Sequence, residues 1–408
     1  MNITLDKSTI SKASSIQITG SKSESNRLLL LQALYPKIIL NNISNSDDSE
    51  VMMRALKSDE KHVDIHHAGT AMRFLTAYFA IQEGRETILT GSKRMKERPI
   101  KILVEALRYL GADITYLEKE GYPPLKITGK TWSNRSVSLK ASVSSQYISA
   151  LLLIAPKLKH GLELVLEGDI TSLPYIKMTL NLLQQIGVDY TFEHNIITIQ
   201  PLGDLQEKKE ITVESDWSSA SYYFSIIALS PQGTEVSLSS YTGHSLQGDA
   251  LLVDIYKHFG VSTYFNANTI TLRKENNFSK ILNLDLKQTP DIAQTITVTC
   301  FVLGMSCYLT GLHTLKIKET DRLVALKTEI EKLGGTIEIT ESTLRLLERN
   351  QPIKENISIA TYDDHRMAMA FAPLAFKVPV VIKDAKVVSK SYPTFWEDLR
   401  SLGFKVLS

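Results

Sequence analysis

The chain has little cysteine, which excludes the small proteins that disulfides or zinc hold together. Cys300 and Cys307 are the two cysteines among 408 residues. Two thiols cannot supply a disulfide framework or a four-cysteine zinc site. Because they lie seven residues apart in an apolar stretch, we expect them to share one face of a helix. The sequence therefore predicts two small core residues in a reducing compartment.

An excess of charge of one sign is also missing. The formal net charge is +2, with 46 Lys and Arg against 44 Asp and Glu. This balance does not favour nucleic acid or an acidic partner, and the basic residues alternate with Met and small residues instead of aromatics. The composition, 43% hydrophobic and 22% charged, is typical of globular proteins. A chain of this length exceeds the ~300 residues that one core usually serves, so we expect at least two domains.

Long hydrophobic runs are absent as well. The opening MNITLDKSTI has no basic segment followed by an apolar one, which is unlike a signal peptide. The uncharged stretch 295–312 contains Thr, Ser and Gly, and we expect a buried helix there instead of a membrane span. These features predict a cytoplasmic enzyme or binding protein.

Several well-known active-site motifs do not occur. The chain lacks G-x-x-x-x-G-K-[ST], G-x-G-x-x-G, H-E-x-x-H and G-x-S-x-G, so ATP, dinucleotide, zinc-protease and serine-hydrolase readings lose support. His62 and His66 are four residues apart, but no third ligand accompanies them, and we expect no metal site.

What the chain does contain is a repeated pattern. Five amphipathic segments end in an apolar residue and a glycine, at intervals of 69 to 76 residues: Gly111, Gly187, Gly260, Gly334 and Gly403. Apolar residues three and four apart predict a helix, and the glycine predicts its left-handed end. Alternating, strand-like runs follow, such as 112–117, 261–265 and 335–340.

A second, more apolar segment begins with small polar residues and occurs six times: 21–36, 68–80, 142–156, 216–231, 289–304 and 363–376. We interpret the chain as six repeats, the first one shortened, in which an amphipathic helix and strands cover an apolar inner helix. Six units suit two lobes of three. The charged run 207–210 favours a boundary there, so the predicted lobes are 20–213, and 1–19 with 214–408. The predicted fold class is mixed α/β (α+β).

Basic residues gather where these elements begin: Lys22, Arg27, Arg73, Arg94, Lys96, Arg98, Lys318, Arg322, Arg366 and Lys390. Cations are unfavourable at a helix N-terminus. Their recurrence there indicates bound anions, since unpaired N–H groups at such ends attract negative charge. Ser and Asp at the same ends also have a simpler explanation as helix caps.

The segments that carry these residues resemble the 5-enolpyruvylshikimate-3-phosphate synthase family, nearly end to end and in order. The matching motifs are Gly-Ser-Lys-Ser-Glu-Ser-Asn-Arg at 20–27, Ala-Gly-Thr-Ala-Met-Arg at 68–73, Arg-Met-Lys-Glu-Arg-Pro at 94–99, Ser-Ser-Gln at 144–146, Lys-Glu-Thr-Asp-Arg at 318–322 and Asp-His-Arg-Met-Ala-Met at 364–369. The resemblance implies a two-lobed inside-out α/β barrel with three βαβαββ copies per lobe and an active site in the cleft. It also implies a cytoplasmic, monomeric enzyme without metal or organic cofactor. Such an enzyme transfers the enolpyruvyl group of phosphoenolpyruvate to the 5-hydroxyl of shikimate 3-phosphate and releases phosphate.

The resemblance also implies site residues, position by position. Those for shikimate 3-phosphate are Lys22, Ser23, Arg27, Ser144, Ser145, Gln146, Ser172, Tyr175, Asp291 and Lys318. Those for phosphoenolpyruvate are Lys22, Gly69, Arg98, Gln146, Arg322, Arg366 and Lys390. We hypothesise that Glu319 protonates the methylene carbon and later removes the methyl proton. Asp291 would take the hydroxyl proton, and Lys22 would assist the leaving phosphate.

Some positions depart from the family pattern: His67 and Thr314 stand where Asn is usual, Leu173 where Lys is common, and the segment before His66 is short. Two alternatives remain. One is the related transferase acting on UDP-N-acetylglucosamine, although the 94–99 loop lacks the cysteine expected of it. The other is a non-catalytic anion-binding repeat protein, which would not need the acids Asp291 and Glu319.

Overall fold

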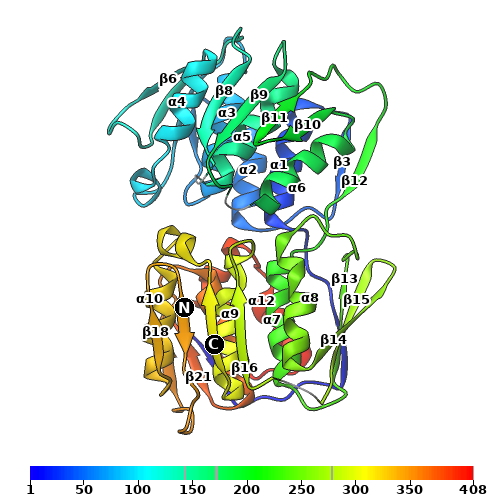
Figure 1. The fold of residues 1–408 in the computed structure, drawn as a ribbon, viewed down its shortest axis with the longest axis vertical. Helices are drawn as coiled ribbons and strands as arrows, with labels where there is room; N and C mark the ends of the chain where they lie inside the picture. Colours follow the sequence, from blue (N-terminus) through cyan, green and yellow to red (C-terminus); the bar gives the residue numbers. More distant parts are fainter. Residues whose placement is uncertain (142–143, 171–172, 277–278, 408) are drawn as a thin grey trace. The chain divides into compact units, whose positions relative to one another are not determined.

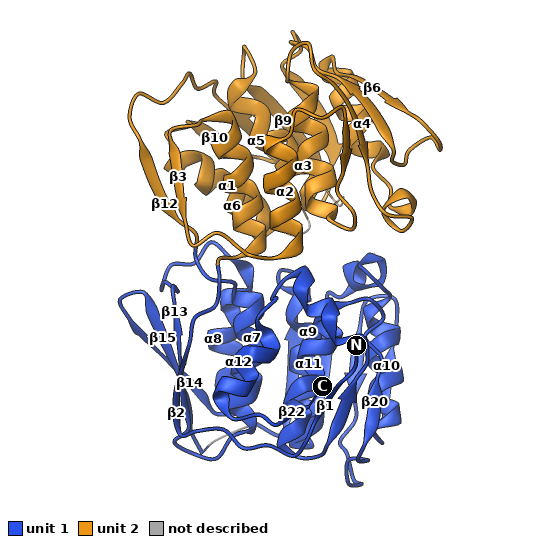
Figure 2. Cartoon of the chain, turned by 180° about the vertical axis from the view of Figure 1, so that it is seen from behind, with its two compact units in different colours: residues 1–19, 214–408 blue, residues 20–213 orange. Residues whose placement is uncertain are grey.

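The computed structural model describes residues 1–407 apart from 142–143, 171–172 and 277–278 (Figure 1). The chain divides into two compact units (Figure 2): unit 1 is residues 1–19 with 214–408, and unit 2 is residues 20–213. The N-terminal segment belongs to unit 1 because its strands pair there, β1 (Ile3–Leu5) with β21 (Val380–Ile382) and β2 (Ala13–Ile16) with β13 (Glu235–Ser239).

Unit 2 alternates helices and short strands. Its helices are α1 (Lys22–Leu34), α2 (Asp47–Lys57), α3 (Gly69–Ala80), η1 (Met95–Glu97), α4 (Lys101–Leu110), α5 (Ser145–Ile154), η2 (Ala155–Lys157) and α6 (Leu173–Gln185). Its strands are β3 (Ile38–Asn41), β4 (His62–Asp64), β5 (Glu86–Thr90), β6 (Asp113–Tyr116), β7 (Leu125–Thr128), β8 (Ser136–Lys140), β9 (Leu162–Glu167), β10 (Tyr190–Glu193), β11 (Ile196–Ile199) and β12 (Lys209–Thr212).

Unit 1 is built in the same manner. Its helices are α7 (Trp217–Leu229), η3 (Gly248–Leu251), α8 (Leu252–Ile255), η4 (Tyr256–Phe259), η5 (Pro290–Ile292), α9 (Ala293–Leu303), η6 (His313–Ile317), α10 (Arg322–Lys332), α11 (His365–Phe371), η7 (Ala372–Phe376), η8 (Ala385–Lys390) and α12 (Phe395–Leu402). Besides the four strands already named, it contains β14 (Val261–Asn266), β15 (Thr269–Lys274), β16 (Ile281–Asp285), β17 (Ser306–Thr310), β18 (Ile337–Ile339), β19 (Leu344–Leu346), β20 (Ile357–Ile359) and β22 (Val406–Leu407).

Five of the sheets share one pairing scheme, a parallel pair followed by two antiparallel neighbours. Their strand orders are β4-β5-β7-β6, β8-β9-β11-β10, β2-β13-β15-β14, β16-β17-β19-β18 and β20-β21-β1-β22. The sixth is the parallel pair β3-β12. Alternating burial along β9 and β13 shows one face of each strand turned to the core. The mixed α/β class is thus confirmed. The barrel that the resemblance implies is not, since each sheet of the described residues is open.

Apolar helices occupy the interior of each unit. Helices α1, α3 and α5 contact one another in unit 2, and α9 contacts both α7 and α11 in unit 1. Helix α7 is buried on every side except at Ser218, as expected for a helix that is apolar all round. By contrast, α4 buries one face and exposes the other, so amphipathic helices lie at the surface.

The predicted helix ends are confirmed. Gly111, Gly187, Gly260, Gly334 and Gly403 have φ between 70° and 123°. The amphipathic segment near 251–259 is an exception to a regular α-helix: only Leu252–Ile255 is α-helical, between two 3₁₀ turns. Val253, Ile255 and Tyr256 have low helix propensity, which favours this tighter form.

The prediction for the two cysteines is wrong in one respect. Both are buried, but Cys300 lies on α9 and Cys307 on strand β17, so they share no helix face. Gly304, at φ 76°, ends the helix between them. For the same reason the stretch 295–312 is not one helix. Among the described residues, no helix is both long and apolar enough to cross a bilayer.

Candidate functional site

In unit 2, four helices bring their N-termini to the same end. The Arg27 guanidinium of α1 donates to Thr179 Oγ1 of α6 at 2.8 Å and to Ser149 Oγ of α5 at 2.9 Å, and it lies 5.4 Å from the ring centre of Phe74 of α3. Each of these residues is the fifth to seventh of its helix. The first two turns of the four helices therefore meet, and the free N–H groups of helix starts make this part of unit 2 attractive to anions.

Most residues predicted to bind shikimate 3-phosphate lie at this end. Lys22 and Ser23 begin α1, and Ser144 caps α5 by accepting from the N–H of Gln146 at 3.4 Å. The Gln146 amide reaches across to Thr70 Oγ1 of α3 at 3.2 Å. Lys22 pairs with Asp48 at 3.7 Å. Other predicted residues here are Ser145 in the first turn of α5 and Tyr175, whose ring lies 5.8 Å from the Arg27 guanidinium. Ser172 lies outside the described residues.

Gly69 and Arg98 lie against each other at the start of α3. A Cβ added to Gly69 would stand 2.5 Å from Arg98 Nη1, closer than such atoms approach. The buried Arg73 supports both segments by donating to Gly69 O at 3.1 Å and Pro99 O at 2.9 Å. The absence of a side chain at Gly69 is therefore what lets the Arg98 guanidinium lie over the helix start.

The buried arginines of this end donate to neutral oxygens. Arg27 uses two hydroxyls and the carbonyl of Ser23, and Arg73 uses two carbonyls. Burial lowers the pKa of Arg27 to about 10, although the nearby Tyr175 and Glu24 act to raise it. Burial, together with the charge of Arg98, also lowers the pKa of Arg73 to about 10. Both shifts come mainly from the burial of the guanidinium groups.

In unit 1, the guanidinium of Arg322 donates hydrogen bonds to three carboxylates. Arg322, at the start of α10, is 2% exposed. Its Nε donates to Asp364 Oδ2 at 2.6 Å, its Nη1 to Asp291 Oδ1 at 2.9 Å, and its Nη2 to Glu319 Oε2 at 2.8 Å. The structure thus brings Arg322 together with both acids that we expect to move protons.

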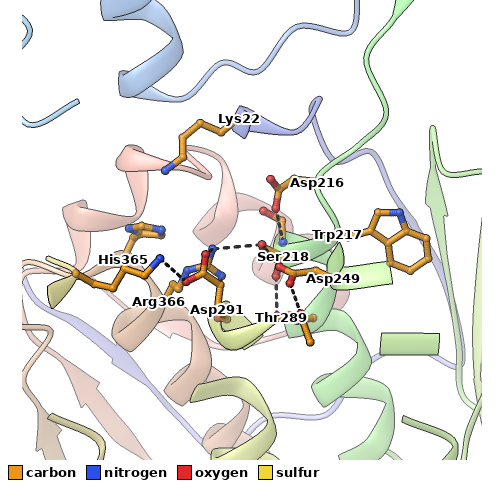
Figure 3. Close-up of polar contacts among 12 residues, drawn as sticks. Lys22, Asp216, Trp217, Ser218, Asp249, Thr289, Asp291, His365 and Arg366 are labelled. Atoms are coloured by element: carbon orange, nitrogen blue, oxygen red, sulfur yellow. Dashed lines mark hydrogen bonds and ion pairs between the residues drawn. The ribbon is translucent and has the colours of Figure 1, made fainter. Parts of the chain in front are cut away.

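Asp291 in turn faces three cations. Besides Arg322, its side chain lies 3.2 Å from Lys318 Nζ and 3.4 Å from Arg366 Nη2. Arg366 also donates to the Asp291 carbonyl at 3.0 Å (Figure 3). Every member stands at the start of a helix: Asp291 before α9, Lys318 and Glu319 before α10, and Arg366 in the first turn of α11.

These contacts set the protonation states. Burial alone would raise the pKa of Asp291, but Lys318, Arg366 and Arg322 outweigh it and hold this pKa well below its usual value. Burial likewise acts to lower the pKa of Arg322, whereas Asp364, Glu319 and Asp291 raise it. Asp291 is therefore ionised, and Arg322 fully charged, at neutral pH.

Lys390 joins this group through the backbone. Its Nζ donates to Asp363 O at 2.7 Å. Tyr362 and Asp363 have φ of 54° and 55°, an uncommon conformation for residues other than glycine. The Tyr362 hydroxyl anchors this turn by donating to the buried Glu329 at 2.6 Å. The turn leads into Asp364, which caps α11 and holds Arg322.

Sequence reasoning gave no role to several residues that belong to the unit 1 group. Asp364 stands within a matching motif, yet its ion pair with Arg322 spans 42 residues. Asp249 contacts Ser218 and Thr289, which are 31 and 40 residues away in the chain. A carboxylate next to a glycine in Ser-Leu-Gln-Gly-Asp resembles a surface turn, so no local pattern distinguishes it.

The departures from the family pattern have local explanations. His67 is exposed, and its ring nitrogen lies 3.1 Å from Ser92 Oγ. Thr314, in η6, buries a hydroxyl that has no hydrogen-bond partner among the described residues. Leu173 is the first residue of α6.

The two arrangements differ in what they can do chemically. The unit 2 end can hold phosphate or carboxylate groups through N–H donors and cations. The unit 1 group adds carboxylates that can carry protons beside cations that can hold an anion. Within the described residues, no group of three or more His, Cys, Asp or Glu side chains is arranged to hold a metal ion.

Comparison with known proteins gives a consistent result. The family model described as EPSP synthase (3-phosphoshikimate 1-carboxyvinyltransferase) matches residues 53–399. A 3-phosphoshikimate 1-carboxyvinyltransferase from Bacteroides fragilis is 46% identical over 402 residues, covering 96% of this chain and 95% of the relative. One from Vibrio campbellii is 36% identical over 416 residues, covering 95% and 96%. The solved EPSP synthase of Acinetobacter baumannii shares the fold, with a TM-score of 0.81, 20% identity and complete coverage of both chains.

Proposed function

We propose, because this chain belongs to the EPSP synthase family, that it transfers the enolpyruvyl group of phosphoenolpyruvate to the 5-hydroxyl of shikimate 3-phosphate and releases phosphate. It is thus a 3-phosphoshikimate 1-carboxyvinyltransferase of the shikimate pathway, which leads to the aromatic amino acids. The observation that carries this conclusion is the 46% identity to a curated enzyme of that name over 96% of the chain.

The anionic groups of the substrates need the two kinds of site described above. Each substrate carries one phosphate and one carboxylate. In this proposal the helix starts of unit 2, with Lys22, Ser23, Ser144, Ser145 and Gln146, hold shikimate 3-phosphate. Arg27, Ser172 and Tyr175 complete that set, and Asp291 and Lys318 of unit 1 bind its hydroxyl side. Phosphoenolpyruvate is held by Gly69, Arg98, Arg322, Arg366 and Lys390, with Lys22 and Gln146 facing both ligands.

The reaction is an addition followed by an elimination. The 5-hydroxyl oxygen bonds to C2 of phosphoenolpyruvate as its proton passes to the Asp291 carboxylate. Glu319, which takes up a proton from solvent once the substrate has displaced it from Arg322, gives that proton to the methylene carbon, which becomes a methyl group. Glu319 then removes a methyl proton, the C2–O bond to phosphate breaks, and the double bond reforms. Lys22 stabilises the departing phosphate. General acid–base steps of this kind contribute about 10²- to 10⁴-fold each.

The ion pairs of Arg322 prepare this chemistry. An incoming carboxylate or phosphate takes the place of Glu319 or Asp291 on the guanidinium, since all three are anions that seek the same donors. If Asp291 is released from Arg322 and from Lys318, two of the three cations that lower its pKa are removed, Arg366 being the third, and the carboxylate becomes a stronger base. Substrate binding therefore activates the two acids.

The finer parts of the interpretation belong to the same proposal. Six repeats, three per unit with the first shortened, are supported by the common pairing scheme of five sheets and by the two-stranded β3-β12 sheet. We further propose that the enzyme acts as a cytoplasmic monomer without nucleic-acid partners or cofactors. Light scattering at micromolar concentration tests the monomer, and a dimer would contradict it.

A phosphate-release assay tests the function. The purified chain is incubated with phosphoenolpyruvate alone, with shikimate 3-phosphate added, and with UDP-N-acetylglucosamine added instead. We expect release with shikimate 3-phosphate only. Release with the nucleotide sugar would favour the related transferase, and no release in any mixture would favour a binding protein.

A further inference from the structure

Asp249 lies at the centre of a hydrogen-bond network that none of the substrate contacts above requires. It is 6% exposed and belongs to η3. One carboxylate oxygen accepts from the hydroxyl of Ser218 and the other from the hydroxyl of Thr289 (Figure 3). Ser218 lies in the first turn of α7, and Thr289 immediately precedes η5. One buried carboxylate thus joins two separate segments of unit 1.

The arm through Ser218 leads to Arg366. Arg366 Nη2 donates to Ser218 Oγ at 3.2 Å. A serine hydroxyl has one hydrogen, and here it points to Asp249, which leaves the oxygen lone pairs available for Arg366. Asp249 therefore orients the Ser218 hydroxyl so that its oxygen accepts from Arg366 Nη2. This contact holds one end of the Arg366 guanidinium in place.

The arm through Thr289 leads to Asp291. Thr289 stands two residues before Asp291, with Pro290 between them. Arg366 contacts both the carbonyl of Asp291, at 3.0 Å, and its carboxylate, at 3.4 Å. One arm therefore ends at Arg366 and the other at Asp291, which contact each other. The Asp249 carboxylate, which joins the arms, sets the separation of Arg366 from Asp291.

We propose, on the basis of the function proposed above, that Asp249 is a positioning residue for the transfer reaction: through Ser218 and Thr289 it holds the Arg366 guanidinium and the Asp291 backbone in the geometry that receives phosphoenolpyruvate and the acceptor hydroxyl. A carboxylate suits this role because it accepts two hydroxyl hydrogens and donates none, whereas an amide has only one acceptor oxygen. Burial raises the pKa of Asp249 on balance, and the charge of Arg366 opposes part of that rise.

Three variants separate the arms. Ser218→Ala breaks the arm to Arg366 and is expected to raise KM for phosphoenolpyruvate about tenfold with little change in kcat. Thr289→Val breaks the arm to Asp291 and is expected to lower kcat about tenfold. Asp249→Asn is expected to do both, since small misplacements of reacting groups cost ten- to a hundredfold. Asp254→Asn is the matched control, because Asp254 is exposed and pairs only with neighbouring Lys257 among the described residues.

Combining Asp249→Asn with Ser218→Ala tests whether the two act in series. We expect the double variant to have the KM of Asp249→Asn alone, because the same arm is already broken. If the KM of the double variant rises by the product of the two single increases, Asp249 does not act on Arg366 through Ser218. Kinetic constants within twofold of wild type for a folded Asp249→Asn variant would overturn the proposal as a whole.

A crystal structure of Ser218→Ala keeps this inference separate from the proposed function. If wild-type protein releases no phosphate, the proposed function fails. The positioning role is then still decided by the separation of Arg366 Nη1 from Asp291 O. We expect this contact, 3.0 Å in the unmodified chain, to lengthen by about an ångström, the scale of misplacement that affects rates. An unchanged contact would show that Asp249 does not position the pair.

Discussion

The buried arginines of unit 2 donate to hydroxyl and carbonyl oxygens, whereas the buried arginine of unit 1 donates to carboxylates. Arg27 and Arg73 keep a charge that their hydrogen-bond partners do not cancel, and burial lowers the pKa of each to about 10. Around Arg322, burial is outweighed by Asp364, Glu319 and Asp291, which raise its pKa. The buried arginines of unit 2 therefore donate to neutral acceptors, with Glu24 near Arg27 as a weaker influence on its pKa, whereas unit 1 supplies an ion-paired group that a substrate must rearrange.

This difference suits the two tasks of the proposed reaction. A phosphate is best held where cations and N–H donors have no competing carboxylate. Removing the hydroxyl proton needs a carboxylate, and the nearby cations keep Asp291 ionised. The comparison can be tested by changing one group at a time.

The largest expected effect follows from changing Glu319, the residue of unit 1 that is proposed to carry the proton. Glu319→Gln keeps the size of the side chain and one acceptor for Arg322, but it cannot carry the proton. We expect phosphate release to fall about 10²- to 10⁴-fold, while calorimetry shows shikimate 3-phosphate still bound. The matched control is Glu341→Gln, at a side chain that is 88% exposed and paired with Lys316. Retention of most activity by Glu319→Gln would make this residue a structural carboxylate only.

The stability of the two units should respond unequally to loss of an arginine. Arg322→Met leaves the fully buried Asp364 without its cation and should cost about 3–5 kcal/mol. Arg27→Met leaves neutral hydroxyl and carbonyl acceptors and should cost about 1–3 kcal/mol. Urea unfolding followed by tryptophan fluorescence reports on both, because Trp132 lies in unit 2 and Trp217 and Trp396 lie in unit 1. Equal costs would show that the acceptor type does not matter.

A smaller effect is expected from changing Gly69, whose lack of a side chain lets the Arg98 guanidinium lie against the start of α3. Gly69→Ala places a methyl group 2.5 Å from Arg98 Nη1, so the guanidinium has to shift. We expect KM for phosphoenolpyruvate to rise about tenfold, equivalent to a weakened charged hydrogen bond, with kcat little changed. Gly203→Ala is the control, since nothing lies within 4 Å of the added Cβ there. An unchanged KM would indicate that Arg98 does not bind this substrate over Gly69.

The sequence predicts the helix starts and the residue types at them, because capping, periodicity and glycine ends are local properties. It does not predict which charges meet. Arg27 reaches Thr179, 152 residues away, and Arg322 reaches Asp364 across 42. The apolar face of α1 gives no sign that Arg27 is buried, because its stacking partners Phe74 and Tyr175 come from other helices. The wrong prediction for Cys300 and Cys307 has a different, local cause: Gly304 adopts a left-handed conformation and ends α9, so Cys307 lies on strand β17.

The smallest expected effect is the pH dependence that Asp291 gives to unit 1. Its native pKa lies well below the ordinary value of 3.8 because Lys318, Arg366 and Arg322 outweigh burial. A lowered carboxyl pKa stabilises the native state fully above 3.8 and progressively less as pH falls through 3.8 toward the native value. The stability difference between wild type and Asp291→Asn should therefore be constant from pH 7 to about 5 and shrink by on the order of 1 kcal/mol toward pH 3. Asp254→Asn, at an exposed aspartate, is the matched control, and the unfolding of both variants can be followed by the same fluorescence. A difference that grows toward low pH would mean that burial, not the three cations, governs Asp291.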